Sequence, residues 1–168
     1  MLIRARKQLR LPGWNYKTPG YYFVTLCVEQ RQYLFGNIEN CVMILNDAGQ
    51  MINEVCCVLP ALYSGISLDK YIIMPDHMHF IIIITPGYNK KEGRRQSTAP
   101  TLGDIIKKFN TYTTYRYRQG IYKLNLLPYF KHLWQRNYYE HIIRNNESLE
   151  KIRSYIDNNP GTWKSDDH

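Results

Sequence analysis

Residues 77–85, with the sequence HMHFIIIIT, constrain the fold most, because this segment is apolar on both faces of a strand. Successive side chains of a strand point to opposite faces. One face would carry Met78, Phe80, Ile82 and Ile84, and the other His77, His79, Ile81 and Ile83. The wholly apolar face predicts contact with the main core. The histidine face continues into two isoleucines, so it needs a partial cover of its own.

The rest of the chain predicts three further strands and three helices. We expect strands at residues 19–30, 67–74, 77–85 and 133–143, and helices at about 46–60, 101–120 and 145–160. The turn formers Pro75 and Asp76 separate the second and third strands. The expected helix ends are Gly120 for the second helix, and Asn146 as N-cap and Pro160 as stop for the third.

This element order, β-α-β-β-α-β followed by one more helix, predicts an α+β ferredoxin-like fold with an additional C-terminal helix. We expect a single domain over residues 1–168, with its core at about 11–160. Residues 86–100 are rich in Gly, Lys, Arg and Ser and predict a mobile basic loop.

The ferredoxin-like order places both core helices on one face of the sheet, so the histidines should lie on the other, open face. The additional helix is the one element left to cover that face. His77 and His79 could share a metal ion, bind a phosphate, or be two exposed strand residues. A histidine-triad hydrolase would have a third histidine at position 81, which is isoleucine.

Tyr155 and Asn159 of the additional helix are the candidates to complete a site on that face. They are four residues apart and therefore neighbours on the helix surface. An amide oxygen from Asn159 suits Mg²⁺ or Mn²⁺, and a phenol beside the ion could attack a phosphodiester to form a phosphotyrosine. Tyr115 and Gln119 have the same spacing, but their helix should pack on the opposite face.

The composition favours a polyanionic partner. Lysine and arginine number 22 against 14 acidic residues, a formal charge of +8, and there are 15 tyrosines that can stack on unpaired bases. The candidate DNA contacts are Arg136, Tyr138 and Tyr139, the N-terminal Arg4, Arg6, Lys7 and Arg10, and Lys107 with Lys108. Glu140 or His141 could also assist a metal ion.

Four cysteines without a CxxC spacing suggest a reducing cytosol, and the apolar run at 80–84 is too short to span a bilayer. We therefore expect a cytoplasmic protein that makes no membrane contact and is nucleoid-associated when bound to DNA.

Four segments in one order resemble the single-tyrosine HUH transposases of the IS200-like group, and most of all the REP-associated tyrosine transposase branch. These segments are LPGWNYKTPGYYFVTLCVEQRQYLFG, PDHMHF, LWQRNYYEHIIRN and YIDNNP, and the resemblance runs from about Leu11 to Pro160. It implies an HUH fold and a divalent ion, Mg²⁺ or Mn²⁺, held by His77, His79 and Asn159. It also implies that Tyr155 forms a 5′-phosphotyrosine on single-stranded DNA.

Substrates in this family are DNA hairpins, which in the REP-associated branch are extragenic palindromic repeats. The protein itself is expected to be a monomer or a homodimer. Two other readings of the residues stay open. One is a noncatalytic ferredoxin-like module that binds RNA or DNA. The other is a metal-dependent phosphodiesterase that uses water as its nucleophile.

Overall fold

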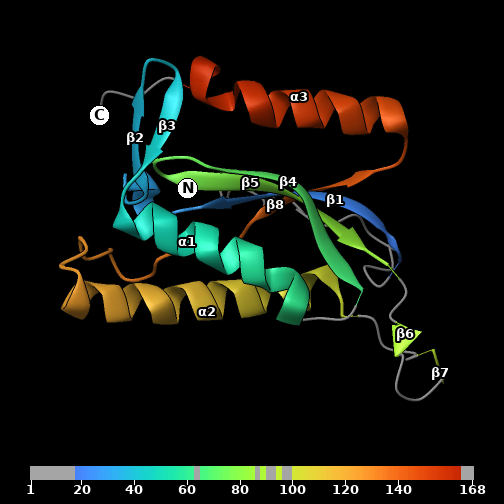
Figure 1. The fold of residues 1–168 in the computed structure, drawn as a ribbon, viewed down its shortest axis with the longest axis horizontal. Coiled ribbons are helices and arrows are strands. Elements are labelled where there is room, and N and C mark those ends of the chain that lie inside the picture. The colour runs from blue at the N-terminus through green and yellow to red at the C-terminus, as the bar shows by residue number, and fades with distance from the viewer. Residues whose placement is uncertain (1–17, 63–64, 86–87, 90–93, 96–99, 164–168) are drawn as a thin grey trace, which may run out of the picture.

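A computed structural model describes residues 18–62, 65–85, 88–89, 94–95 and 100–163. Its centre is an antiparallel sheet of four strands in the order β4-β5-β1-β8 (Figure 1). These strands are β1 (Gly20–Cys27), β4 (Ile66–Ile73), β5 (His77–Ile84) and β8 (Tyr139–Ile143). With the helices between them, they form the β-α-β-β-α-β order of a ferredoxin-like sheet. The predicted α+β fold class is confirmed.

Two helices cover one face of this sheet, namely α1 (Asp47–Val58) and α2 (Leu102–Lys123) (Figure 1). Each begins at a side-chain cap: Asn46 accepts a hydrogen bond from the Gly49 amide, and Thr101 forms a capping box with Asp104. The main core lies between these helices and the sheet. On β5 it contains Met78, Phe80, Ile82 and Ile84, which is the face predicted from the alternation.

The third helix, α3 (Asn146–Thr162), lies on the opposite face of the sheet (Figure 1). A second apolar cluster joins it to the sheet. The cluster consists of Phe23, Ile81, Ile143, Leu149 and Ile156, all buried. The additional helix therefore covers the histidine face, as the sequence predicts.

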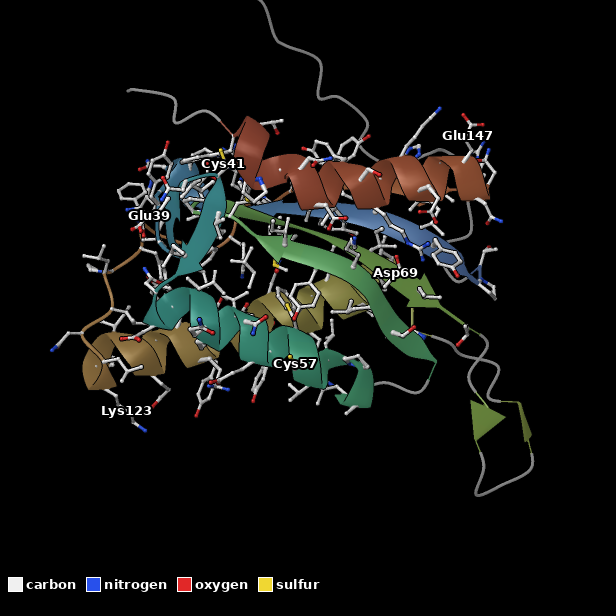
Figure 2. All side chains as sticks on the ribbon, turned by 45° about the horizontal axis from the view of Figure 1, so that its top comes forward. Glu39, Cys41, Cys57, Asp69, Lys123 and Glu147 are labelled. Carbon is white, nitrogen blue, oxygen red and sulfur yellow. The ribbon has the colours of Figure 1, made fainter. Side chains whose placement is uncertain are left out.

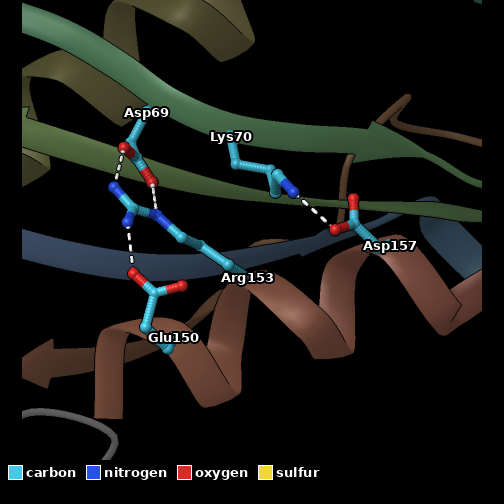
Figure 3. Close-up of polar contacts among 5 residues, drawn as sticks. All are labelled: Asp69, Lys70, Glu150, Arg153 and Asp157. Atoms are coloured by element: carbon cyan, nitrogen blue, oxygen red, sulfur yellow. Dashed lines mark hydrogen bonds and ion pairs between the residues drawn. The ribbon is translucent and has the colours of Figure 1, made fainter. Parts of the chain in front are cut away.

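A β-bulge in β4 shapes the contact with α3. Leu68 pairs with Ile82 and Tyr71 pairs with Phe80, so Asp69 and Lys70 together stand opposite Ile81. Both of these consecutive side chains reach α3. Asp69 accepts two hydrogen bonds from Arg153, at 2.8 and 2.5 Å, and Lys70 Nζ lies 2.5 Å from Asp157 Oδ2 (Figure 3).

The structure contains short elements that the sequence did not predict. A hairpin of β2 (Gly36–Glu39) and β3 (Val42–Leu45) lies between β1 and α1, with Asn40 and Cys41 at positive φ in its turn. The other short elements are the 3-10 turns Glu29–Arg31 and Leu59–Leu62, and the pair β6 (Tyr88–Asn89) and β7 (Arg94–Arg95). That last pair falls within the predicted basic loop, most of which lies outside the described residues.

Two predicted boundaries are wrong because tertiary packing overrides a local signal. Gly120 does not end α2, which continues to Lys123; instead, a Cβ there would lie 2.4 Å from Leu126 Cδ1, so glycine permits a close approach. The last strand begins at Tyr139 rather than at residue 133. Of residues 133–138, Trp134 alone makes a β-bridge, with Val28, while its indole Nε1 donates to Thr113 Oγ1 at 2.8 Å.

Both predicted ends of the last helix are also corrected. Asn145, not Asn146, is the N-cap, and its side chain accepts from the Ser148 amide. Pro160 does not stop the helix, which continues to Thr162 and closes with a hydrogen bond from the Trp163 amide to the Asn159 carbonyl at 2.9 Å. The proline costs one backbone hydrogen bond, but its side chain is buried. Among the described residues, no helix combines the length and apolar character needed to cross a bilayer.

Candidate metal and tyrosine site

His77 and His79 are the first and third residues of β5, and both point towards α3. Each is 5% exposed, so α3 buries them rather than leaving an open surface. Their Nε2 atoms lie 3.1 Å apart, and the rings meet edge to face. Two imidazole nitrogens thus converge on one buried point.

The opposite nitrogen of each ring has its own partner. His77 Nδ1 lies 2.5 Å from Asp76 Oδ1, and His79 Nδ1 lies 2.8 Å from Thr25 Oγ1. We assign both Nδ1 atoms as donors, since a carboxylate can only accept and a hydroxyl oxygen can accept. Each Nε2 then keeps its lone pair. Hydrogen bonding to the second nitrogen is the usual support of a metal-binding histidine.

Asp76 is itself held by Arg31, whose Nε lies 2.9 Å from Asp76 Oδ2. Gln30 and Arg31 both have positive φ, at 56° and 55°, in the turn that follows β1. From the sequence, Asp76 was predicted only to form a turn, and no role was predicted for Thr25 or Arg31. The one available signal was the aspartate directly before the histidine.

The His79 imidazole is electrically neutral at ordinary pH. Its pKa is lowered to about 3, first by burial and then by the nearby His77 and Arg31. A neutral ring keeps its Nε2 lone pair free to coordinate or to accept a hydrogen bond.

Tyr155 reaches this pair from α3. Its Oη lies 3.3 Å from His79 Nε2, and its ring meets Phe23 and His79 at their edges. Since the neighbouring Ile156 is buried against the sheet, Tyr155 stands at the flank of the helix and is 48% exposed. The hydroxyl therefore touches the buried site while the side chain stays accessible from solvent.

Asn159 lies one helical turn beyond Tyr155 and is 6% exposed. Its Oδ1 is buried and has no hydrogen-bond partner among the described residues, a costly state for an amide oxygen. Hydrogen-bond distances join Tyr155 to His79 and His79 to His77, whereas Asn159 Oδ1 forms no hydrogen bond to either histidine.

These residues fit a small divalent ion. Nitrogen ligands at right angles around such an ion stand about 3 Å apart, and the two Nε2 atoms are 3.1 Å apart. The buried Asn159 oxygen offers a third donor that lacks another partner. Within the described residues, no group of three or more His, Cys, Asp or Glu side chains forms a metal-binding cluster.

Glu140 and His141 of β8, the two further candidates to assist a metal ion, lie on opposite faces of the sheet. Glu140 pairs with Val24 and so belongs to the face covered by α1 and α2, away from the histidines. His141 pairs with Phe23, on the histidine face, and is exposed.

The other candidate residues are spread over the molecule. Tyr139 is 52% exposed and meets Phe23 edge-on, whereas Tyr138 packs against the main core. Arg136 is exposed in the segment before β8, and Lys107 and Lys108 are exposed on α2. Arg4, Arg6, Lys7 and Arg10 lie outside the described residues. The competing Tyr115 and Gln119 lie on α2, across the sheet from the histidines.

A cleft of about 660 Å³ opens beside the histidine end of the sheet. Asp76 and Arg31 line it, together with Tyr33, Leu127 and Pro128. Of the ion pair that supports His77, Arg31 is therefore exposed at this cleft, whereas Asp76 is buried at its edge. Tyr33 also meets Trp163, just after α3, with ring centroids 5.3 Å apart.

The fold and the site together define an α+β protein in which a helix presents a tyrosine to two strand histidines. The model of the family described as "Transposase IS200 like" matches residues 18–159. The chain belongs to this IS200-like transposase family, whose members are enzymes of mobile DNA elements.

Two relatives extend the comparison. A protein from Haemophilus influenzae Rd, described as uncharacterized, is 34% identical over 174 aligned positions that cover 98% of this chain and 93% of the relative. The solved structure of a REP-associated tyrosine transposase bound to a REP hairpin superposes with a TM-score of 0.59 at 18% identity. It covers 90% of this chain and 73% of that one, and at this identity it supports the fold.

Proposed function

We propose that this transposase cuts and rejoins single-stranded DNA that carries a hairpin, with Tyr155 as the nucleophile. The observation that carries the proposal is the 3.3 Å separation between Tyr155 Oη and Nε2 of His79, which itself meets Nε2 of His77. The REP hairpin bound by the structurally similar transposase supports hairpin DNA as the substrate class.

The chemistry is a transesterification. Tyr155 Oη loses its proton and forms a bond to phosphorus, while the bond from phosphorus to the 3′ oxygen breaks and that oxygen leaves as a 3′-OH. The product is a 5′-phosphotyrosine. A 3′-OH can attack this linkage later and restore a phosphodiester without ATP, because one ester has replaced another.

The residues of the site have separate tasks in this reaction. His77 and His79, oriented by Asp76 and Thr25, would hold a divalent ion, Mg²⁺ or Mn²⁺, with the Asn159 oxygen as a third ligand. Such an ion, when bound, polarises the phosphate oxygens and offsets developing charge. Phe23 fixes the rings of Tyr155 and His79 relative to each other.

A covalent-adduct assay tests the proposal. The protein is incubated with Mn²⁺ and a labelled hairpin oligonucleotide with single-stranded flanks, and the products are separated on a denaturing gel. We expect an adduct with the natural sequence and none with Tyr155→Phe. The matched control is Tyr122→Phe on α2, where the side chain is 85% exposed. An adduct that persists in Tyr155→Phe would refute Tyr155 as the nucleophile.

The same assay separates the rival functions. A phosphodiesterase that uses water would keep most of its turnover in Tyr155→Phe and form no adduct. A noncatalytic module would bind without cleaving and without a metal requirement. An RNA-binding sheet of the usual kind presents an open face, whereas α3 covers this one, and this favours the enzyme.

A further inference from the structure

A basic groove lies across the sheet from Tyr155, between α2 and the segment that leads into β8. Its volume is about 790 Å³. The residues that matter in its lining are Arg118, Lys131, Arg136, Tyr115 and Tyr129. No aspartate or glutamate of the described residues lines it. We call it the α2 groove.

The positive charge of this groove is not neutralised within the described part of the chain. Arg118 donates to the hydroxyl of Tyr129 at 2.7 Å, and Lys131 Nζ lies 5.2 Å from the centre of the Phe130 ring. Neither they nor Arg136 pairs with a carboxylate of a described residue. By contrast, Arg116 on the same helix pairs with Glu54 at 2.7 Å. Clustered cations without internal partners favour an anionic ligand.

The wall opposite α2, formed by residues 129–136, is held in place although it contains no regular helix or strand. Trp134 is fixed by its bridge to Val28 and its hydrogen bond to Thr113, and the Phe130 amide donates to Gln32 Oε1 at 2.8 Å. Because folding already orders this surface, binding a ligand costs little further conformational entropy.

The groove is connected to the histidine end of the sheet. The Gln135 amide donates to the Cys27 carbonyl at 2.8 Å, and Cys27 stands opposite His77 in the sheet. Arg136 follows immediately in the groove lining. Three residues further, Tyr139 lies on the histidine face against Phe23. Three extended residues span about 10 Å at most, so Arg136 and Tyr139 mark a short path around the edge strand β8.

We propose that the α2 groove holds the single-stranded DNA that flanks the cleaved bond, and this rests on the proposed function. Lys131 and Arg136 contact its phosphates, and the 58% exposed ring of Tyr115 stacks on an unpaired base. An unpaired strand fits better than a hairpin stem, because the stacking face of Tyr115 needs a base that is free of its partner.

The test measures binding of the full chain in a Tyr155→Phe background with Mn²⁺, where the strand stays uncut. Two oligonucleotides are used, a labelled hairpin with flanks and the same hairpin without them. Lys131→Gln/Arg136→Gln is compared with Lys123→Gln/Lys151→Gln, which removes the same charge from two exposed lysines outside the groove (Lys123 is labelled in Figure 2). Tyr115→Ala is compared with Tyr122→Ala.

We expect Lys131→Gln/Arg136→Gln to weaken binding of the flanked hairpin about tenfold. It should also lower the slope of log affinity against log salt by about 1.4, or 0.7 for each single-strand phosphate contact. Tyr115→Ala should weaken binding about fivefold or more. The groove variants should change binding of the flankless hairpin little, and both control variants should change binding of either oligonucleotide little.

Equal effects of the groove and control variants would overturn the assignment. So would equal weakening with both oligonucleotides, because the groove would then hold the stem. If the natural sequence forms the covalent adduct while the groove variants bind like their parent, the groove assignment alone fails. If no adduct forms and the Tyr155→Phe parent does not bind the hairpin, both proposals fail.

Discussion

The hydroxyl of Tyr155 lies 3.3 Å from His79 Nε2, so a helix from one end of the chain completes a site that begins on a central strand. The two residues are 76 positions apart in sequence. Their contact depends on how α3 packs on the sheet, on the neutral state of His79 and on the hydrogen-bond partners of the two histidines. Each of these dependences can be tested separately.

Asn159→Leu should weaken metal binding and raise the free energy of unfolding of the metal-free protein. The substitution removes a buried oxygen that has no described partner, so the metal-free protein should gain about 1 kcal/mol in its free energy of unfolding. Loss of a ligand should weaken Mn²⁺ binding by about tenfold or more. Denaturant unfolding in EDTA and a Mn²⁺ titration followed by electron paramagnetic resonance measure the two effects. The exposed neighbour supplies the control, Asn158→Leu, which should change neither; an unchanged Mn²⁺ affinity in Asn159→Leu would remove Asn159 from the ligand set.

Asp76→Asn should weaken the site without emptying it. The amide keeps the shape of the side chain but loses the charge that faces both His77 Nδ1 and Arg31. We expect Mn²⁺ affinity to fall about 10- to 100-fold, as is typical when the partner of a metal-binding histidine is changed. Glu39→Gln, at an exposed position on β2, is the control. Equal affinities for the two variants would mean that Asp76 does not orient His77.

The metal-free protein should lose stability as the pH falls from about 6.5 towards 3. The pKa of His79 is lowered to about 3 in the folded state, whereas an unfolded histidine has a pKa of about 6.5. The unfolded chain therefore binds the proton first, and the free energy of unfolding decreases through this window. His79→Gln should flatten that slope when unfolding is measured in EDTA at several pH values. A slope that is unchanged in this variant would show that His79 does not cause it.

Asp69→Asn should loosen α3. Asp69 binds Arg153 through two hydrogen bonds at a position where its side chain is 14% exposed, so the loss should cost about 1 kcal/mol of stability. Because α3 carries Tyr155, adduct formation should also slow. Glu147→Gln breaks the exposed pair with Lys151 on the same helix and should cost less than about 0.5 kcal/mol. If adduct formation slows equally in both variants, the seating of α3 is not the cause.

Much of the fold could be predicted because the alternation of side chains along β5 alone indicates which layer each of its faces contacts. Its apolar face meets α1 and α2, and its histidine face meets α3. Only the helical repeat was needed to predict that Tyr155 and Asn159 lie one turn apart on the surface of the last helix. The β2–β3 hairpin was missed because Asn40 and Cys41 adopt positive φ without a glycine to mark the turn.

The support of the histidines could not be predicted in the same way. Thr25 reaches His79 because β1 and β5 pair in one particular register, which no local pattern encodes. Arg31 reaches Asp76 through a turn with two residues at positive φ. Gly120 and Pro160 carried local stop signals that packing overrode, one by close approach to Leu126 and the other by burial in the last turn of α3.

The β-bulge in β4 places an anion, Asp69, next to a cation, Lys70. On α3 a cation, Arg153, pairs with Asp69, and an anion one helical turn later, Asp157, pairs with Lys70. A slip of α3 by one turn, about 5.4 Å, would bring Asp157 against Asp69 in one direction and Arg153 against Lys70 in the other. Like charges would meet in both cases. The order of the charges therefore fixes the position of α3 along the sheet, and with it the position of the Tyr155 phenol.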